Sequence, residues 1–246
     1  GGKYTAKDPN YAVVDQLRKD ILALRSQLGL TPSSFAKAQK KREEYSAEKQ
    51  SRIELLLEEA ATHAVEHAAD YMAEVDGYVS GVLSGEIRAC VEIVQACQRY
   101  MDDLKNPRWD FRAEPANEII AIIETTVCHQ QGEFLDATPL RGTPFLLLPY
   151  HKFIVYNIMG FYVAGTKERR FKETLDFVPR KNIKTTFAAA LAWALALYER
   201  RSGSKVYEVG GALKQALEGF DFLRYNLKRE RLTVDDDPVG GLRIIN

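Results

Sequence analysis

The stretch from Arg170 to Leu197 constrains the fold more than any other part of this chain. An apolar segment over residues 171–178 leads into a short basic turn, and an alanine-rich helix is expected to begin at Lys184-Thr185. A strand, a tight turn and a helix that starts with Lys-Thr form the layout of a nucleotide phosphate site, where backbone N–H groups and the helix dipole hold anionic oxygens. We expect Lys184 to reach the β- and γ-phosphates of ATP and the Thr185 hydroxyl to bind Mg²⁺.

The turn departs from the usual phosphate-loop pattern at both of its glycine positions. In G-x-x-x-x-G-K-[ST], counted back from Lys184, these positions hold Val178 and Ile183. A β-branched residue takes a positive φ angle only at a cost in energy, so the spacing alone is a weak signal. The alternative interpretation is a basic loop that joins a buried strand to a buried helix.

Residues 171–192 resemble the ATPase motif of the large subunit of tailed-bacteriophage terminases, the motors that drive DNA into a procapsid. Members of that family have an apolar strand, then Pro-Arg-Lys-Asn, then Gly-Lys-Ser/Thr and an alanine-rich helix, and their first glycine is commonly missing. Residues 179–182 match the Pro-Arg-Lys-Asn step, while Ile183 replaces the second glycine. The resemblance implies that ATP and Mg²⁺ are the cofactors and that Thr185 is a metal ligand. It assigns the phosphates to Arg180, Lys181, Asn182, Lys184, Thr185 and Thr186.

The resemblance continues on both sides of this motif and covers about residues 76–230. The matching segments are residues 85–90, 96–104, 109–111, 132–134, 148–153 and 157–161 upstream, and 203–210 and 214–216 downstream. In the family, a Gln that reads adenine follows the aromatic residue of a Leu-Pro-aromatic step, and His151 stands at that position here. The resemblance therefore implies that His151 contacts the adenine.

Residues 1–45 resemble a different protein. Residues 8–28 have the pattern of an amphipathic helix and run into Gly29-Leu-Thr-Pro-Ser-Ser34, which is similar to the C-terminal end of phage terminase small subunits. We therefore expect a small-subunit-like helical tail at 1–45, a helical lead-in region at 46–135 and a partial ATPase core at 136–246.

Apolar periodicity predicts the secondary structure of the whole chain. Helices are expected at about 10–28, 33–75, 85–105, 115–130, 150–161, 185–201 and 211–229, and strands near 144–148, 171–178, 205–209, 231–234 and 242–245. The alternation of strand and helix after residue 170 predicts a parallel sheet flanked by helices. The expected fold class is α/β, with a helical N-terminal half followed by a partial parallel-sheet phosphate-loop ATPase core.

Composition narrows the classes of function. Lys plus Arg and Asp plus Glu both number 34, so the formal net charge is zero and no attraction of the whole surface for DNA is expected. The three cysteines form no C-x-x-C pair, which argues against a zinc ribbon or a disulfide scaffold. No apolar run reaches the length of a membrane span. The resemblance implies a place in the host cytoplasm, with phage DNA, the terminase small subunit and the portal protein as partners and a homo-oligomer at full length.

Two further motifs have simpler interpretations. The segment His63-Ala-Val-Glu-His67 fits H-x-x-E-H, whose spacing lets two imidazoles share a metal, but it lies in an Ala- and Glu-rich helical pattern. The segment Val234-Asp-Asp-Asp237 is similar to the end of an acidic strand that holds Mg²⁺. It lacks a preceding apolar run and a Glu, and Pro238-Val-Gly-Gly241 favours a turn.

Hydrolysis of ATP needs an acidic metal-binding strand and a group that orients water, and no segment here supplies them convincingly. Members of the terminase family carry these groups, and then a nuclease domain, further along the chain. By the resemblance, the chain is expected to be the front part of a large subunit. Two functions remain open: the ATP-binding part of a packaging motor, or a truncated, non-hydrolysing assembly module of the terminase complex.

Overall fold

The computed structural model describes residue 19 and residues 32–244, apart from 135, 180–181, 200–204, 233 and 238–240. These residues belong to two compact units, divided after Arg52. The first part of α2 lies in the first unit, and all the residues discussed below lie in the second unit, which begins at Ile53.

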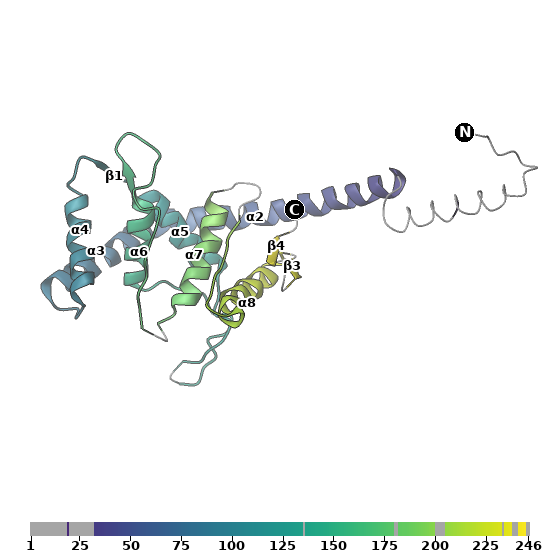
Figure 1. The fold of residues 1–246 in the computed structure, drawn as a ribbon. Helices are drawn as coiled ribbons and strands as arrows, with labels where there is room; N and C mark the ends of the chain where they lie inside the picture. Colours follow the sequence, from purple (N-terminus) through teal and green to yellow (C-terminus); the bar gives the residue numbers. More distant parts are fainter. Residues whose placement is uncertain are drawn as a thin grey trace, which may run out of the picture. The chain divides into compact units, whose positions relative to one another are not determined.

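Helices make up most of the described chain (Figure 1). They are α2 Pro32–Glu66, α3 Ala68–Ser84, α4 Val91–Asp103, α5 Ala113–Thr126, α6 Pro149–Gly160, α7 Lys184–Tyr198 and α8 Leu213–Arg229. The helices expected at 115–130, 150–161, 185–201 and 211–229 are confirmed to within a few residues. The helix expected at 10–28 lies outside the described residues, apart from Lys19.

The centre of the second unit is α5, because the apolar second half of this helix is buried on every side. Its run Ile119-Ile120-Ala121-Ile122-Ile123 is at most 2% exposed. A helical run that is apolar all round is stable only when other elements surround it. Accordingly α5 packs against α3, α6 and α7, and α7 packs in turn against α8 (Figure 1).

The long helix expected at 33–75 is divided in two at His67. α2 ends at Glu66 and α3 begins at Ala68, yet the backbone hydrogen bonds continue across the junction. The N–H of His67 donates to the carbonyl of His63, and the N–H of Tyr71 donates to the carbonyl of His67, both at 3.0 Å. α3 then ends at Gly85, whose φ of 81° is the left-handed cap conformation that glycine adopts without strain.

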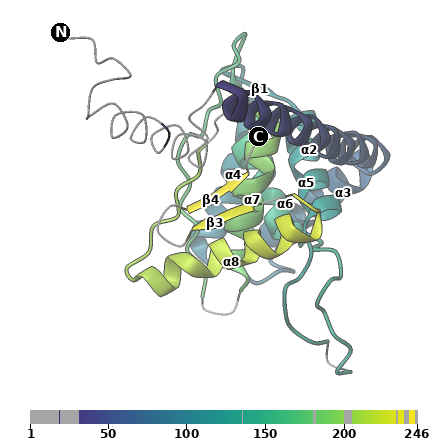
Figure 2. The same cartoon turned by 90° about the vertical axis from the view of Figure 1, so that its right-hand side faces the viewer.

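The described strands are short and pair only antiparallel. β1, Trp109–Phe111, pairs with β2, Phe161–Val163, in the register Asp110 opposite Tyr162. β3, Val234–Asp237, forms a hairpin with β4, Gly241–Ile244, and Figure 2 shows this hairpin next to α8. Neither strand of the β1–β2 pair was expected from the sequence.

The predicted partial parallel-sheet core is therefore wrong. Residues 171–178 and 205–209, expected as parallel strands, have no regular structure and join no sheet of the described chain. An extended segment becomes a strand only when a neighbour takes up its backbone hydrogen bonds, and helices around α5 fill the core instead. The strand expected at 144–148 is likewise reduced to one isolated bridge, between Pro144 and Cys128.

The side chain of Asn226 takes the place of a strand neighbour for Cys128. Its Oδ1 accepts the N–H of Cys128 at 2.7 Å, and its Nδ2 donates to the Cys128 carbonyl at 3.2 Å and to the Phe222 carbonyl at 3.1 Å. Asn226 is 3% exposed, so these bonds are shielded from water. They attach α8 to the segment that follows α5.

Candidate functional site

The turn before α7 holds Ile183 in the left-handed conformation, with φ 58° and ψ 8°. This conformation costs an L-residue roughly 1–2 kcal/mol, and a β-branched side chain is especially rare in it. The phosphate-loop pattern places a glycine at this position, directly before Lys-Ser/Thr. The backbone at Ile183 thus has the conformation that glycine would supply without strain.

The first turn of α7 is open at its N-terminal end. Ile183 provides no side-chain cap, and no acidic residue lies in the first turn. Within the described chain, no acceptor meets the backbone N–H groups of Lys184, Thr185 and Thr186. Unsatisfied N–H groups at the positive end of a helix dipole are suited to bind an anion. Lys184 is exposed beside them, and both threonines are half-buried.

The rest of the predicted phosphate turn is placed only in part. The amide Nδ2 of Asn182 donates to the carbonyl of Pro179 at 3.2 Å, which closes the turn. Arg180 and Lys181 lie outside the described residues. The contacts of these two basic side chains with phosphate therefore stay a prediction.

His151, on α6, lies next to the start of α7. Its ring stacks on Phe187, with centroids 4.5 Å apart and an interplanar angle of 24°, and Phe187 is in the first turn of α7. His151 is 2% exposed, and this burial lowers its pKa to about 4. The structure thus brings the predicted adenine residue next to the predicted phosphate turn. Because the ring is covered by protein, an adenine contact would require it to become accessible, and that contact stays a prediction.

A magnesium site is less complete than the phosphate turn. Thr185 is the predicted metal ligand, and an ATPase site adds an acidic side chain to it. In the part of the chain that the structure describes, no group of three or more His, Cys, Asp or Glu side chains is arranged to hold a metal ion. The acidic residues Asp235–Asp237 lie in the antiparallel β3–β4 hairpin, so they are not at the end of a parallel strand.

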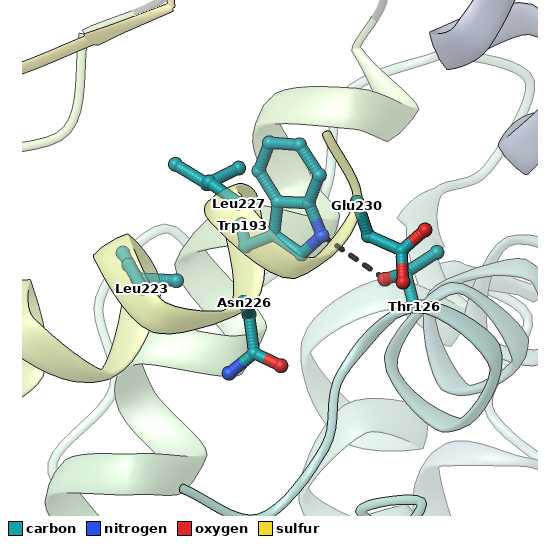
Figure 3. Close-up of a pocket in the computed structure, with 6 residues that line it drawn as sticks. All are labelled: Thr126, Trp193, Leu223, Asn226, Leu227 and Glu230. Carbon is teal, nitrogen blue, oxygen red and sulfur yellow. Dashed lines mark hydrogen bonds between the residues drawn. The ribbon is translucent and has the colours of Figure 1, made fainter. Parts of the chain in front are cut away.

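A depression between α5, α7 and α8 is a packing contact between these helices (Figure 3). The indole Nε1 of Trp193 donates to Thr126 Oγ1 at 3.0 Å across it. The other lining residues are Leu223, Asn226, Leu227 and Glu230. It has no interior space for a water molecule, so it is not a ligand site.

A second group of polar side chains lies between α2, α3, α5 and α6, and the sequence reasoning did not find it. The buried Glu124 carboxylate accepts the Tyr71 hydroxyl at 3.0 Å, and Tyr71 is 2.9 Å from Nδ1 of His63. Lys152, also buried, places its Nζ 2.7 Å from Glu74 and 3.5 Å from Glu124. Burial and the nearby Glu124 raise the pKa of Tyr71 well above its ordinary value. Glu124, which directly follows the apolar run of residues 119–123 in α5, was the signal for this network.

Comparison with protein-family models, with curated proteins and with solved structures finds no match to this chain. None of the described helices is both long enough and apolar enough to cross a membrane. The functional assignment therefore depends on the residues and geometry described above.

Proposed function

We propose that this chain is the ATP-binding part of a phage DNA-packaging terminase motor and that it holds nucleotide phosphates at the Arg180–Thr186 turn. The observation that carries the proposal is the left-handed Ile183 directly before Lys184-Thr185. Backbone strain of this kind persists only where the surrounding structure demands it, and it is concentrated at ligand-binding turns.

The open end of α7 supplies what a phosphate group needs. Its first backbone N–H groups lack acceptors among the described residues, and the helix dipole favours negative charge there by about 0.3–1 kcal/mol. Lys184 is exposed beside this end and adds a full positive charge. Thr185 would contribute its hydroxyl to a Mg²⁺ ion bound with the nucleotide.

The proposal covers binding of the nucleotide and does not extend to its hydrolysis. No carboxylate group arranged for a metal ion stands in the described part of the chain. In the working motor, phage DNA, the terminase small subunit and the portal protein would be the partners, in the cytoplasm of the host. The same resemblance supports assembly of several copies.

A second candidate function, a non-hydrolysing assembly module of the terminase complex, is favoured by the segments on either side of α7 (Figure 1). Leu175 and Phe177 precede the helix and are 89% and 94% exposed, and Val209 follows it and is 92% exposed. Large apolar side chains in such numbers on extended backbone mark a surface that another protein covers. Under this function the phosphate turn would be vestigial.

Calorimetric titration with a non-hydrolysable ATP analogue and Mg²⁺ separates the two functions. We expect saturable binding by the wild type, at least a tenfold loss in Lys184→Ala, and no change in Lys167→Ala, an exposed lysine outside the turn. If Lys184→Ala binds the analogue as tightly as Lys167→Ala does, or if the wild type does not bind it, the nucleotide site is refuted. The assembly module would then be supported if Phe177→Ser weakens association with the terminase small subunit or portal protein in sedimentation velocity.

A further inference from the structure

His63 and His67 lie on one helix face, one turn apart, although α2 ends between them. The 3.0 Å hydrogen bond from the His67 N–H to the His63 carbonyl keeps the helical spacing across the junction. The two imidazole rings are tilted by 37°, with centroids 4.3 Å apart. His63 is half-buried and the side chain of His67 is 44% exposed, so the pair can be reached from solvent.

Hydrogen bonds determine which nitrogen of His63 carries the proton. The Glu124 carboxylate accepts the Leu147 N–H at 2.9 Å and the Tyr71 hydroxyl at 3.0 Å. Lys152 Nζ lies 3.5 Å away, so each of these contacts brings a proton donor to the carboxylate. Because the one hydrogen of the Tyr71 hydroxyl goes to Glu124, its oxygen must accept from His63 Nδ1, 2.9 Å away. Neutral His63 is therefore protonated at Nδ1 and has its lone pair on Nε2.

The same reasoning applies to His67. Its Nδ1 lies 3.2 Å from Oδ2 of Asp70, one turn further along. An ionised carboxylate only accepts hydrogen bonds, so Nδ1 of His67 donates and Nε2 has the lone pair. Both imidazoles in this pair thus have an oxygen partner on Nδ1 and an unprotonated Nε2.

We propose that Nε2 of His63 and Nε2 of His67 together bind one divalent transition-metal ion, such as Zn²⁺ or Ni²⁺. Metal-bound histidines commonly donate their other ring N–H to an oxygen, which fixes the tautomer and the ring orientation. Tyr71, backed by Glu124, does this for His63, and Asp70 does it for His67. Imidazole nitrogen selects zinc, copper, nickel or cobalt over magnesium and calcium.

Water completes the coordination of the ion. Among the described residues no third His, Cys, Asp or Glu side chain is grouped with the pair. The ion would act as a clip, because it joins the last turn of α2 to the residue from which α3 begins. This site is independent of the nucleotide site, so the failure of either proposal leaves the other unaffected.

Calorimetric titration of the full chain with NiCl₂, with thiols kept reduced, tests the site. We expect one ion per chain for the wild type and at least a tenfold weaker affinity for His67→Gln. Tyr71→Phe keeps the apolar packing but removes the oxygen on His63 Nδ1, and we expect it to weaken the affinity about 10–100-fold. His129→Gln and Cys90→Ser are matched controls outside the site, and they should bind like the wild type.

Two further measurements distinguish the loss of a metal ligand from the unfolding of a variant. Far-ultraviolet circular dichroism reports whether each variant is folded, and the melting temperature should rise with NiCl₂ in the wild type but not in His67→Gln. X-ray absorption of the loaded wild type should show imidazole nitrogens bound to the ion. Unchanged affinity in His67→Gln, or an equal loss in His129→Gln, overturns the proposal.

Discussion

A pair of substitutions at Ile183 tests the strain that supports the nucleotide site. Ile183→Gly and Ile183→Ala both remove the side chain, which is 40% exposed, and so lose nearly the same packing. They differ in what the backbone at this position demands. With φ at 58°, alanine keeps the penalty of the left-handed conformation and glycine loses it.

The expected difference follows from two opposing terms. The left-handed conformation costs an L-residue roughly 1–2 kcal/mol. Glycine loses more conformational entropy on folding than alanine, which costs it about 0.5–1 kcal/mol. The glycine variant should therefore unfold with a free energy about 0.5–1 kcal/mol larger than that of the alanine variant. At a position with negative φ the order would be reversed.

Urea denaturation, followed by circular dichroism and tryptophan fluorescence, measures this difference. Buried Trp193 on α7 reports on the helix that follows the turn. For a chain of this size, 1 kcal/mol corresponds to about 2–4 °C in melting temperature, which thermal scans resolve. If Ile183→Ala proves as stable as Ile183→Gly, or more stable, the left-handed turn and the reasoning built on it are refuted.

Three other predictions concern the core. Lys152→Met leaves the buried Glu124 carboxylate without its ammonium neighbour and should lower the free energy of unfolding, measured in urea, by about 3 kcal/mol. The double variant Lys152→Met, Glu124→Gln should recover part of this loss. If it recovers none, the two charges do not interact. Asn226→Ala removes the side-chain hydrogen bonds to the buried backbone N–H and carbonyl of Cys128, and it should lower the free energy of unfolding by about 2 kcal/mol. A loss near zero would show that water replaces the amide. The pKa of His151 is about 4 in the folded chain against an ordinary 6.5, so the unfolded chain takes up the proton first. The stability from neutral His151 is thus complete above pH 6.5 and falls by about 3 kcal/mol towards pH 4, and an identical pH profile for His151→Leu would contradict this.

Local pattern predicted the helices well because apolar spacing and their end residues are encoded within each segment. α6, α7 and α8 begin and end close to the expected residues. The division at His67 was missed, since the helical spacing of His63, His67 and Tyr71 continues through it. A boundary without a proline or glycine leaves little trace in the sequence.

The parallel sheet was predicted wrongly for a different reason. The apolar alternation at Leu175 and Phe177 is typical of a strand, but a strand also needs a partner, and partners are set by the whole chain. These side chains are exposed, so their apolar character reflects something other than burial in this core. The all-apolar run of α5 was the better indicator of what fills the centre.

The candidate site was predictable in its residue types and not in its geometry. The Lys184-Thr185 step marks the start of α7, as expected. That Ile183 would adopt a positive φ was unexpected, because a β-branched residue disfavours it. The network around Glu124 joins it to Tyr71, 53 residues earlier in the chain, and no local pattern reports such a contact.

The central position of α5 also bears on how this unit opens. α3, α6 and α7 all pack on α5, so none of them can detach without exposing its isoleucines to water. Local unfolding that exposes α5 therefore has a high free energy. Amide protons of residues 119–123 should exchange with solvent only when the unit unfolds as a whole. Leu175 and Phe177, in the segment before α7, are exposed and contribute little to this cooperative block, so the amide protons of that part should exchange well before those of residues 119–123.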